Sequence, residues 1–181
     1  MNKNICVLIM PTDQCNMNCV YCYHTPHYNS RENKTMEIET LENIFKKTMP
    51  LFDHVDFLWH GGEPLLAGID FYKEAVRLQK QYAGDRCEVT NKIQTNCTLA
   101  KGELLDYLIK EGFEFGTSLD GITNDYSRGN TEEINQGIDN VRMYGKRCNC
   151  ILVITSLNCD LMIENYNYFK KEILALSLII I

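Results

Sequence analysis

The stretch CNMNCVYC, residues 15–22, comes shortly after the apolar run Ile5–Met10 and carries Cys15, Cys19 and Cys22 in the spacing CxxxCxxC. Three thiols on one short loop are an odd number for disulfide pairing, and a closed structural zinc site normally takes four protein ligands. Cysteine thiolates are the usual ligands of a cubane iron–sulfur cluster, and a cubane held by only three of them keeps one iron open. The spacing therefore favours a 4Fe-4S cluster with a reactive open position, with zinc or unrelated thiols as the alternatives.

The same run resembles the cysteine motif of the radical S-adenosylmethionine (radical SAM) enzymes. In that family the open iron binds SAM, and an electron from the cluster cleaves SAM to a 5′-deoxyadenosyl radical that abstracts hydrogen from a substrate. The resemblance implies two cofactors, one 4Fe-4S cluster on Cys15, Cys19 and Cys22, and SAM. It also implies that Tyr21, the aromatic residue before the third cysteine, lies against the adenine.

Composition narrows the possible functions. The chain has 181 residues, of which 45% are hydrophobic and 23% charged, and its net charge is −6. A negative chain without a basic stripe argues against a nucleic-acid partner. No leader-like segment opens the chain, and no stretch approaches the ~20 apolar residues of a membrane helix. Together with nine cysteines, these features predict a cytoplasmic protein with metal-binding or catalytic thiols and without a membrane partner.

Strand and helix patterns alternate along the chain. Such alternation predicts βαβ units with right-handed crossovers and a parallel sheet. The runs 150–155 and 176–181 are almost continuously apolar, which predicts strands covered on both faces. We therefore expect an α/β fold, an open partial (β/α)6 barrel with outer helices, in one domain spanning residues 1–181. The expected strands are 4–10, 54–60, 88–94, 113–119, 149–157 and 175–181, and the expected helices are 37–49, 71–82, 101–110, 131–144 and 161–174.

Five polar or glycine-containing segments each follow an expected strand. Because the carboxyl ends of parallel strands meet at one rim, these segments should gather there, where such folds bind their ligands. This arrangement is also that of the radical SAM core. The segments are the cysteine loop, 61–64, 94–96, 118–121 and 155–158.

The segment Gly61-Gly62-Glu63 lacks two side chains beside a strand end, so its backbone can approach a ligand closely. A plain strand-ending turn is the alternative. The segment resembles the family's GGE motif, whose backbone contacts the amino group of SAM. Trp59 and His60, just before it, are expected to pack in the strand.

Three further segments resemble SAM-binding motifs of the peptide-modifying branch. Gln94 and Asn96 belong to a QTN segment, although asparagine is also common in turns. Ser118 opens an SLDG segment, in which the serine is implied to contact the SAM carboxylate. Arg128 resembles the arginine of an HDxxR segment, with Asn124 in place of the histidine. Its guanidinium suits a carboxylate or ribose, while a solvated loop arginine is the alternative.

The remaining cysteines are not expected to bind a second cluster. We expect Cys148 and Cys150 to point to different faces of their strand, and therefore to be poor joint ligands. His24 and His27 are not assigned to a metal, and no catalytic residue is assigned beyond the cluster and SAM site. Four scattered cysteines are expected to be buried small hydrophobic residues: Cys6, Cys87, Cys97 and Cys159.

The resemblance is greatest to anaerobic sulfatase-maturating enzymes and related peptide maturases. Relatives in that branch usually carry a further region with auxiliary clusters, whereas this chain stops within an apolar run at 179–181. Three explanations of this apolar end are open: the chain is a fragment, the protein is naturally minimal, or a second chain covers that edge. The implied partners are a peptide or protein substrate and an electron donor such as flavodoxin or ferredoxin. A glycyl-radical-enzyme activase and a non-catalytic cluster-binding remnant are the alternatives.

Overall fold

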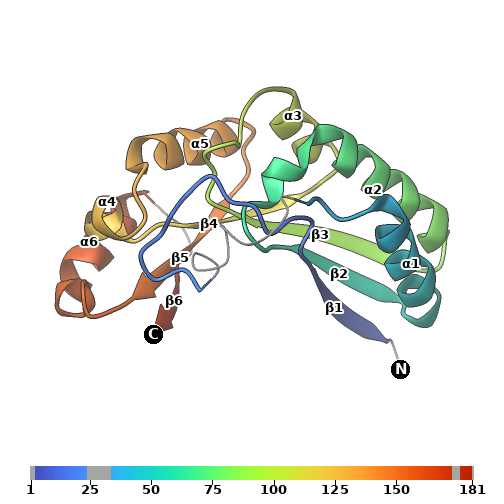
Figure 1. Ribbon diagram of the computed structural model, residues 1–181, viewed down its shortest axis with the longest axis horizontal. Helices are drawn as coiled ribbons and strands as arrows, with labels where there is room; N and C mark the ends of the chain where they lie inside the picture. Colours follow the sequence, from blue (N-terminus) through green and yellow to red (C-terminus); the bar gives the residue numbers. More distant parts are fainter. Residues whose placement is uncertain (1–2, 24–33, 173–175, 181) are drawn as a thin grey trace.

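Six parallel strands lie side by side in chain order and form one sheet. The computed structural model describes residues 3–23, 34–172 and 176–180. The sheet is curled, and the helices lie along its outer side (Figure 1). The strands are β1 Asn4–Ile9, β2 His54–Trp59, β3 Glu88–Thr95, β4 Glu114–Ser118, β5 Cys148–Ile154 and β6 Leu176–Ile180. The expected α/β fold, an open half-barrel of parallel strands, is confirmed.

The helices follow the strands in alternation, as the sequence pattern predicts. Most boundaries differ from the expected ones by a residue or two, but α2 begins at Gly68, three residues before the expected start. The sequence pattern did not predict α4, a single turn between the fourth strand and α5. The helices are α1 Ile38–Thr48, α2 Gly68–Ala83, α3 Gly102–Lys110, α4 Asn124–Ser127, α5 Thr131–Met143 and α6 Met162–Glu172, with short 3₁₀ turns at Met49–Leu51, Pro64–Ala67, Gly121–Thr123 and Cys159–Leu161.

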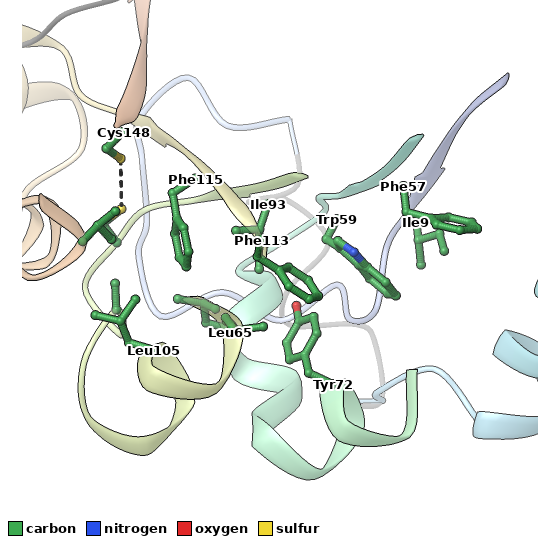
Figure 2. Close-up of a cluster of buried hydrophobic side chains, with 14 of the residues drawn as sticks. Ile9, Phe57, Trp59, Leu65, Tyr72, Ile93, Leu105, Phe113, Phe115 and Cys148 are labelled. Carbon is green, nitrogen blue, oxygen red and sulfur yellow. Dashed lines mark hydrogen bonds between the residues drawn. The ribbon is translucent and has the colours of Figure 1, made fainter. Parts of the chain in front are cut away.

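An aromatic core fills the space between the sheet and the first helices (Figure 2). The rings of Trp59 and Tyr72 lie 5.5 Å apart, and those of Tyr72 and Phe113 lie 5.8 Å apart. The polar atoms of these rings are paired, because Trp59 Nε1 donates to Asn91 Oδ1 and the Tyr72 hydroxyl donates to the Pro64 carbonyl. Trp59 is fully buried, so its expected packing role is confirmed.

Two expectations about cysteines are wrong. Cys148 and Cys150 lie on the same buried face of β5, because residues two apart in a strand point the same way. The sulfur of Cys148 is 4.0 Å from that of Cys97 (Figure 2). Cys6 and Cys159 are exposed, whereas the expected burial is confirmed for Cys87 and Cys97.

Strand β6 differs from the expected covered strand. All five of its residues are exposed, with Leu178 at 49% and Ile180 at 76%. An apolar run predicts a strand but does not say what packs on it. Among residues 3–23, 34–172 and 176–180, no helix has both the length and the apolar character needed to cross a bilayer.

Candidate cofactor-binding site

The cysteine loop after β1 is held against the turn after β2 by backbone contacts. Gly62 N donates to the Thr12 carbonyl at 3.2 Å, and Glu63 N donates to the Gln14 carbonyl at 2.6 Å. A β-carbon on Gly62 would lie only 2.0 Å from the Gln14 carbonyl oxygen. The double glycine therefore lets the cysteine loop, rather than only a ligand, approach the strand end.

A cavity of about 250 Å³ lies at the carboxyl ends of the strands, where the rim loops meet. It collects ten of the eleven predicted site residues: Cys15, Cys19, Tyr21, Cys22, Gly61, Gly62, Gln94, Asn96, Ser118 and Arg128. Six residues outside that set also line it, of which only Thr95 belongs to an expected rim segment: Tyr23, His60, Thr95, Ile151, Val153 and Ile179. The expectation that His60 packs in the strand is wrong, because β2 ends at Trp59 and His60 lines the cavity. Its place next to the double glycine is the signal that could have found it. The apolar residues carry no local signal beyond strand alternation.

The three cysteines of the loop all line this cavity. Cys22 N donates to the Cys19 carbonyl at 3.0 Å, so the loop turns tightly between them. Burial raises the pKa of the Cys19 thiol, and the positive charge of Arg128 acts in the opposite direction. Within the described residues, no group of three or more His, Cys, Asp and Glu side chains is arranged as a ready-made metal site. Cysteine thiolates are ligands of zinc as well as of cubane clusters.

Tyr21 is placed by hydrogen bonds at its hydroxyl. It donates to Asp120 Oδ2 at 2.6 Å and accepts from Arg128 Nη1 at 2.7 Å. Burial raises the pKa of Tyr21, which keeps the phenol protonated. The Nε of Arg128 has no hydrogen-bond partner among the described residues, although it is buried. The guanidinium therefore lines the cavity with part of its donor fork unused.

Gln94 and Ser118 meet at the ends of neighbouring strands, where Gln94 Nε2 donates to Ser118 Oγ at 3.0 Å. Asn96 instead faces the cysteine loop. Its Nδ2 donates to Asn16 Oδ1 at 2.8 Å and lies 4.0 Å from the sulfur of Cys15. Asn96 thus braces the loop that carries the cysteines, besides lining the cavity.

Glu63 is the predicted site residue that does not line the cavity. Its side chain is fully buried, and its carboxylate accepts from Leu65 N, Thr95 Oγ1 and Asn96 N. Burial raises the pKa of Glu63, and these donors act in the opposite direction. The side chain therefore ties two rim loops together.

Two buried asparagines in or near the expected rim segments hold turns together and do not line the cavity. Asn124, which stands where the motif has histidine, is buried, accepts from Asp120 N and donates to the Gly129 carbonyl. These hydrogen bonds hold the turn that places Arg128 at the cavity. Asn158 is also buried, and it closes the turn after β5 through Thr155 N and the Val153 carbonyl. The segment 155–158 therefore caps a strand and does not line the cavity. His24 and His27 lie outside the described residues.

Comparisons with known proteins agree with the fold and the motifs. The profile of the Radical SAM superfamily matches residues 9–169, so the chain belongs to this family. It is 32% identical to a serine-type anaerobic sulfatase-maturating enzyme of Bacteroides thetaiotaomicron, over 93% of this chain and 44% of that enzyme. It is 31% identical to a cysteine-type anaerobic sulfatase-maturating enzyme of Clostridium novyi, over 94% of this chain and 49% of that enzyme.

Solved structures with a similar fold include one protein with bound AdoMet. Native anSMEcpe with bound AdoMet superposes with a TM-score of 0.89 at 27% identity, over 97% of this chain and 51% of that one. The same protein with bound AdoMet and Cp18Cys peptide gives a TM-score of 0.87 at 28% identity, over 96% of this chain and 50% of that one. The chain spans about half the length of the relatives it matches.

Proposed function

We propose that residues 1–181 form the radical SAM core of an enzyme that modifies a peptide or protein side chain, with one 4Fe-4S cluster on Cys15, Cys19 and Cys22. These cysteines would hold the cluster, which would supply the electron for reductive cleavage of SAM and thereby for hydrogen abstraction from the substrate. The observation that carries the proposal is the gathering of three cysteines and the SAM-motif residues around one cavity. The sulfatase-maturating and peptide-bound relatives support a peptide or protein substrate.

The chain's own residues would bind and orient SAM. Arg128 and Ser118 supply donors for its carboxylate, and the ring of Tyr21 supplies an apolar face for its adenine. Ile151, Val153 and Ile179 form an apolar wall that would help exclude water from the reacting centre. The electron donor would be a flavodoxin or ferredoxin in a cytoplasm at low oxygen.

The test is anaerobic reconstitution with iron and sulfide, followed by dithionite and SAM. We expect about 4 Fe per chain and release of 5′-deoxyadenosine. Cys19→Ala should lose the iron and the cleavage together. The matched control, Cys159→Ala, removes an exposed thiol outside the cavity and should keep both. Retained cleavage in Cys19→Ala would contradict the assignment of the cluster.

A non-catalytic cluster-binding remnant is the second candidate. Such a remnant would bind the cluster but would release no 5′-deoxyadenosine. A glycyl-radical-enzyme activase would show the same cleavage, and only the modified residue of its partner would identify it. The relatives named above are maturases, which favours the peptide-modifying function.

A further inference from the structure

Asp120 joins three separate segments at the rim, although it does not line the cavity. Its side chain is fully buried at the end of β4. Oδ2 accepts from the Tyr21 hydroxyl at 2.6 Å and from Ser127 Oγ at 2.6 Å, and Oδ1 accepts from Val153 N at 3.0 Å. A buried carboxylate is costly unless it is hydrogen-bonded, and this one has three donors.

The contact with Tyr21 fixes more than one residue. Because the Tyr21 hydroxyl donates its hydrogen bond to Asp120, its lone pairs are left to accept from Arg128 Nη1 at 2.7 Å. The phenol thus lies between a carboxylate and a guanidinium, and its orientation is set at both sides. Burial opposes the charge of Arg128, but the neighbouring Tyr21, Cys19 and Asp120 raise its pKa above the ordinary value.

The cysteine loop and the turn after β4 are also joined by backbone. Val20 N donates to the Ser127 carbonyl at 2.8 Å. Val20 and Tyr21 both lie between the second and third cysteines. The turn at 120–128 is therefore the support against which this part of the loop is held.

We propose that Asp120 is the positioning residue of the site: through the Tyr21 hydroxyl, it sets the cysteine loop and Arg128 relative to the SAM cavity. This inference rests on the proposed function. A residue that only stabilised the fold would affect all rim contacts alike. The contacts described here instead predict that losing Asp120 releases two cavity-lining side chains, Tyr21 and Arg128.

The experiment measures SAM affinity from the change that SAM causes in the EPR spectrum of the reduced, reconstituted chain. Asp120→Asn and Tyr21→Phe should each keep their iron and raise the Kd for SAM about tenfold. Asp120→Asn removes the charge that accepts from the Tyr21 hydroxyl, and Tyr21→Phe removes that hydroxyl with its hydrogen bonds to Asp120 and from Arg128. The Kd of the double variant should not exceed the larger of the two single-variant Kd values, since both changes remove the same Asp120–Tyr21 hydrogen bond. Ser127→Ala is the matched control. It removes a 2.6 Å hydrogen bond from the same carboxylate but leaves the link to Tyr21, so its Kd should stay within about twofold.

Each outcome decides the inference. A Kd unchanged in both single variants overturns it, and so does a double variant whose effects simply add. If Asp120→Asn fails to fold, Tyr21→Phe alone carries the test, because it removes only a hydroxyl from a partly exposed ring. If the wild-type chain takes up no cluster, or its cluster does not respond to SAM, the proposed function itself fails. A normal wild-type response with normal variants removes only the role of Asp120.

Discussion

The backbone nitrogen of Asn96 donates to Oε2 of Glu63 at 2.8 Å, which joins the turn after β3 to the turn after β2. The other carboxylate oxygen accepts from Thr95 Oγ1 at 2.7 Å and from Leu65 N at 2.9 Å. All these donors converge on one buried carboxylate. The acidic residue of the GGE segment is therefore needed as an acceptor with two free oxygens, and its side chain braces the rim from behind the cavity.

Glu63→Gln should consequently destabilise the fold by about 2–4 kcal/mol. The amide keeps one acceptor oxygen, but its NH₂ group would face a donor that it cannot satisfy. Denaturant unfolding of the anaerobic apo chain measures the change. Glu103→Gln, an exposed substitution in the first turn of α3, should stay within about 0.5 kcal/mol. Equal stability of the two variants would show that the buried carboxylate does not brace the rim.

Gly62→Ala should disturb the cysteine loop directly. The added β-carbon would meet the carbonyl oxygens of Gln14 at 2.0 Å and Asp13 at 2.6 Å, and both are backbone atoms that cannot rotate away. Overpacking of this kind typically costs about 1–3 kcal/mol, here by displacing the loop. We expect reconstitution to incorporate less than about half of the wild-type iron.

The control for that substitution is Gly145→Ala. Gly145 has a φ of +69° and no atom near its would-be β-carbon, so alanine strains the backbone there without touching the loop. This variant should lose some stability but keep full iron content. Full iron content in Gly62→Ala as well would contradict the close packing of the loop on the double glycine.

The sequence predicts the elements of this fold well because hydrophobic periodicity is a local signal. Alternating strand and helix patterns place the rim segments on one edge, and ten of the predicted site residues do line one cavity. Side-chain partners across the rim are a different matter. Tyr21 and Asp120 are 99 residues apart in the chain, and nothing local to either residue predicts their hydrogen bond.

The same distinction explains the other differences. Glycine and acidic residues after a strand predict a rim turn, but they do not say whether Glu63 points into the cavity or behind it. The apolar composition of β6 predicts a strand and carries no information about what covers it, and all its residues are exposed. The expected faces of Cys148 and Cys150 are wrong because they misapply strand periodicity: positions two apart share a face.

Ser118→Ala should weaken SAM binding while leaving the iron in place. Ser118 lines the cavity and already accepts from Gln94 Nε2, so its own proton is available for a carboxylate. Losing one such donor should cost about 1–3 kcal/mol of binding free energy. The EPR response of the reduced cluster to SAM gives the Kd. Ser156→Ala, an exposed serine after β5, should leave the Kd unchanged. An unaltered Kd in Ser118→Ala would remove Ser118 from the SAM site.

The free energy of unfolding should depend on pH through Asp56, which lies outside the cavity. Its carboxylate accepts from Thr90 Oγ1 and from Lys92 Nζ, and the hydrogen bond from Thr90, followed by that from Lys92, lowers its pKa from 3.8 to about 2. The unfolded chain then binds this proton at a higher pH than the folded chain. The stabilisation is therefore present above about pH 4 and is lost as the pH falls toward 2.

Asp56→Asn should remove that part of the pH dependence. The difference in unfolding free energy between wild type and variant should be constant near pH 5, shrink from pH 4 downward and be smallest near pH 2. Below pH 5 the neighbouring His54 stays protonated throughout, because a hydrogen bond to Glu88 raises its pKa, so it does not confuse the comparison. The side chain of Asp56 is 31% exposed, so about 1 M salt should reduce the difference by screening. Asp70→Asn, at a side chain that is 95% exposed, is the control and should leave the acid limb of the stability curve unchanged. A difference for Asp56→Asn that is as large at pH 2 as at pH 5 would mean that packing, rather than the charge of the carboxylate, stabilises this strand pair.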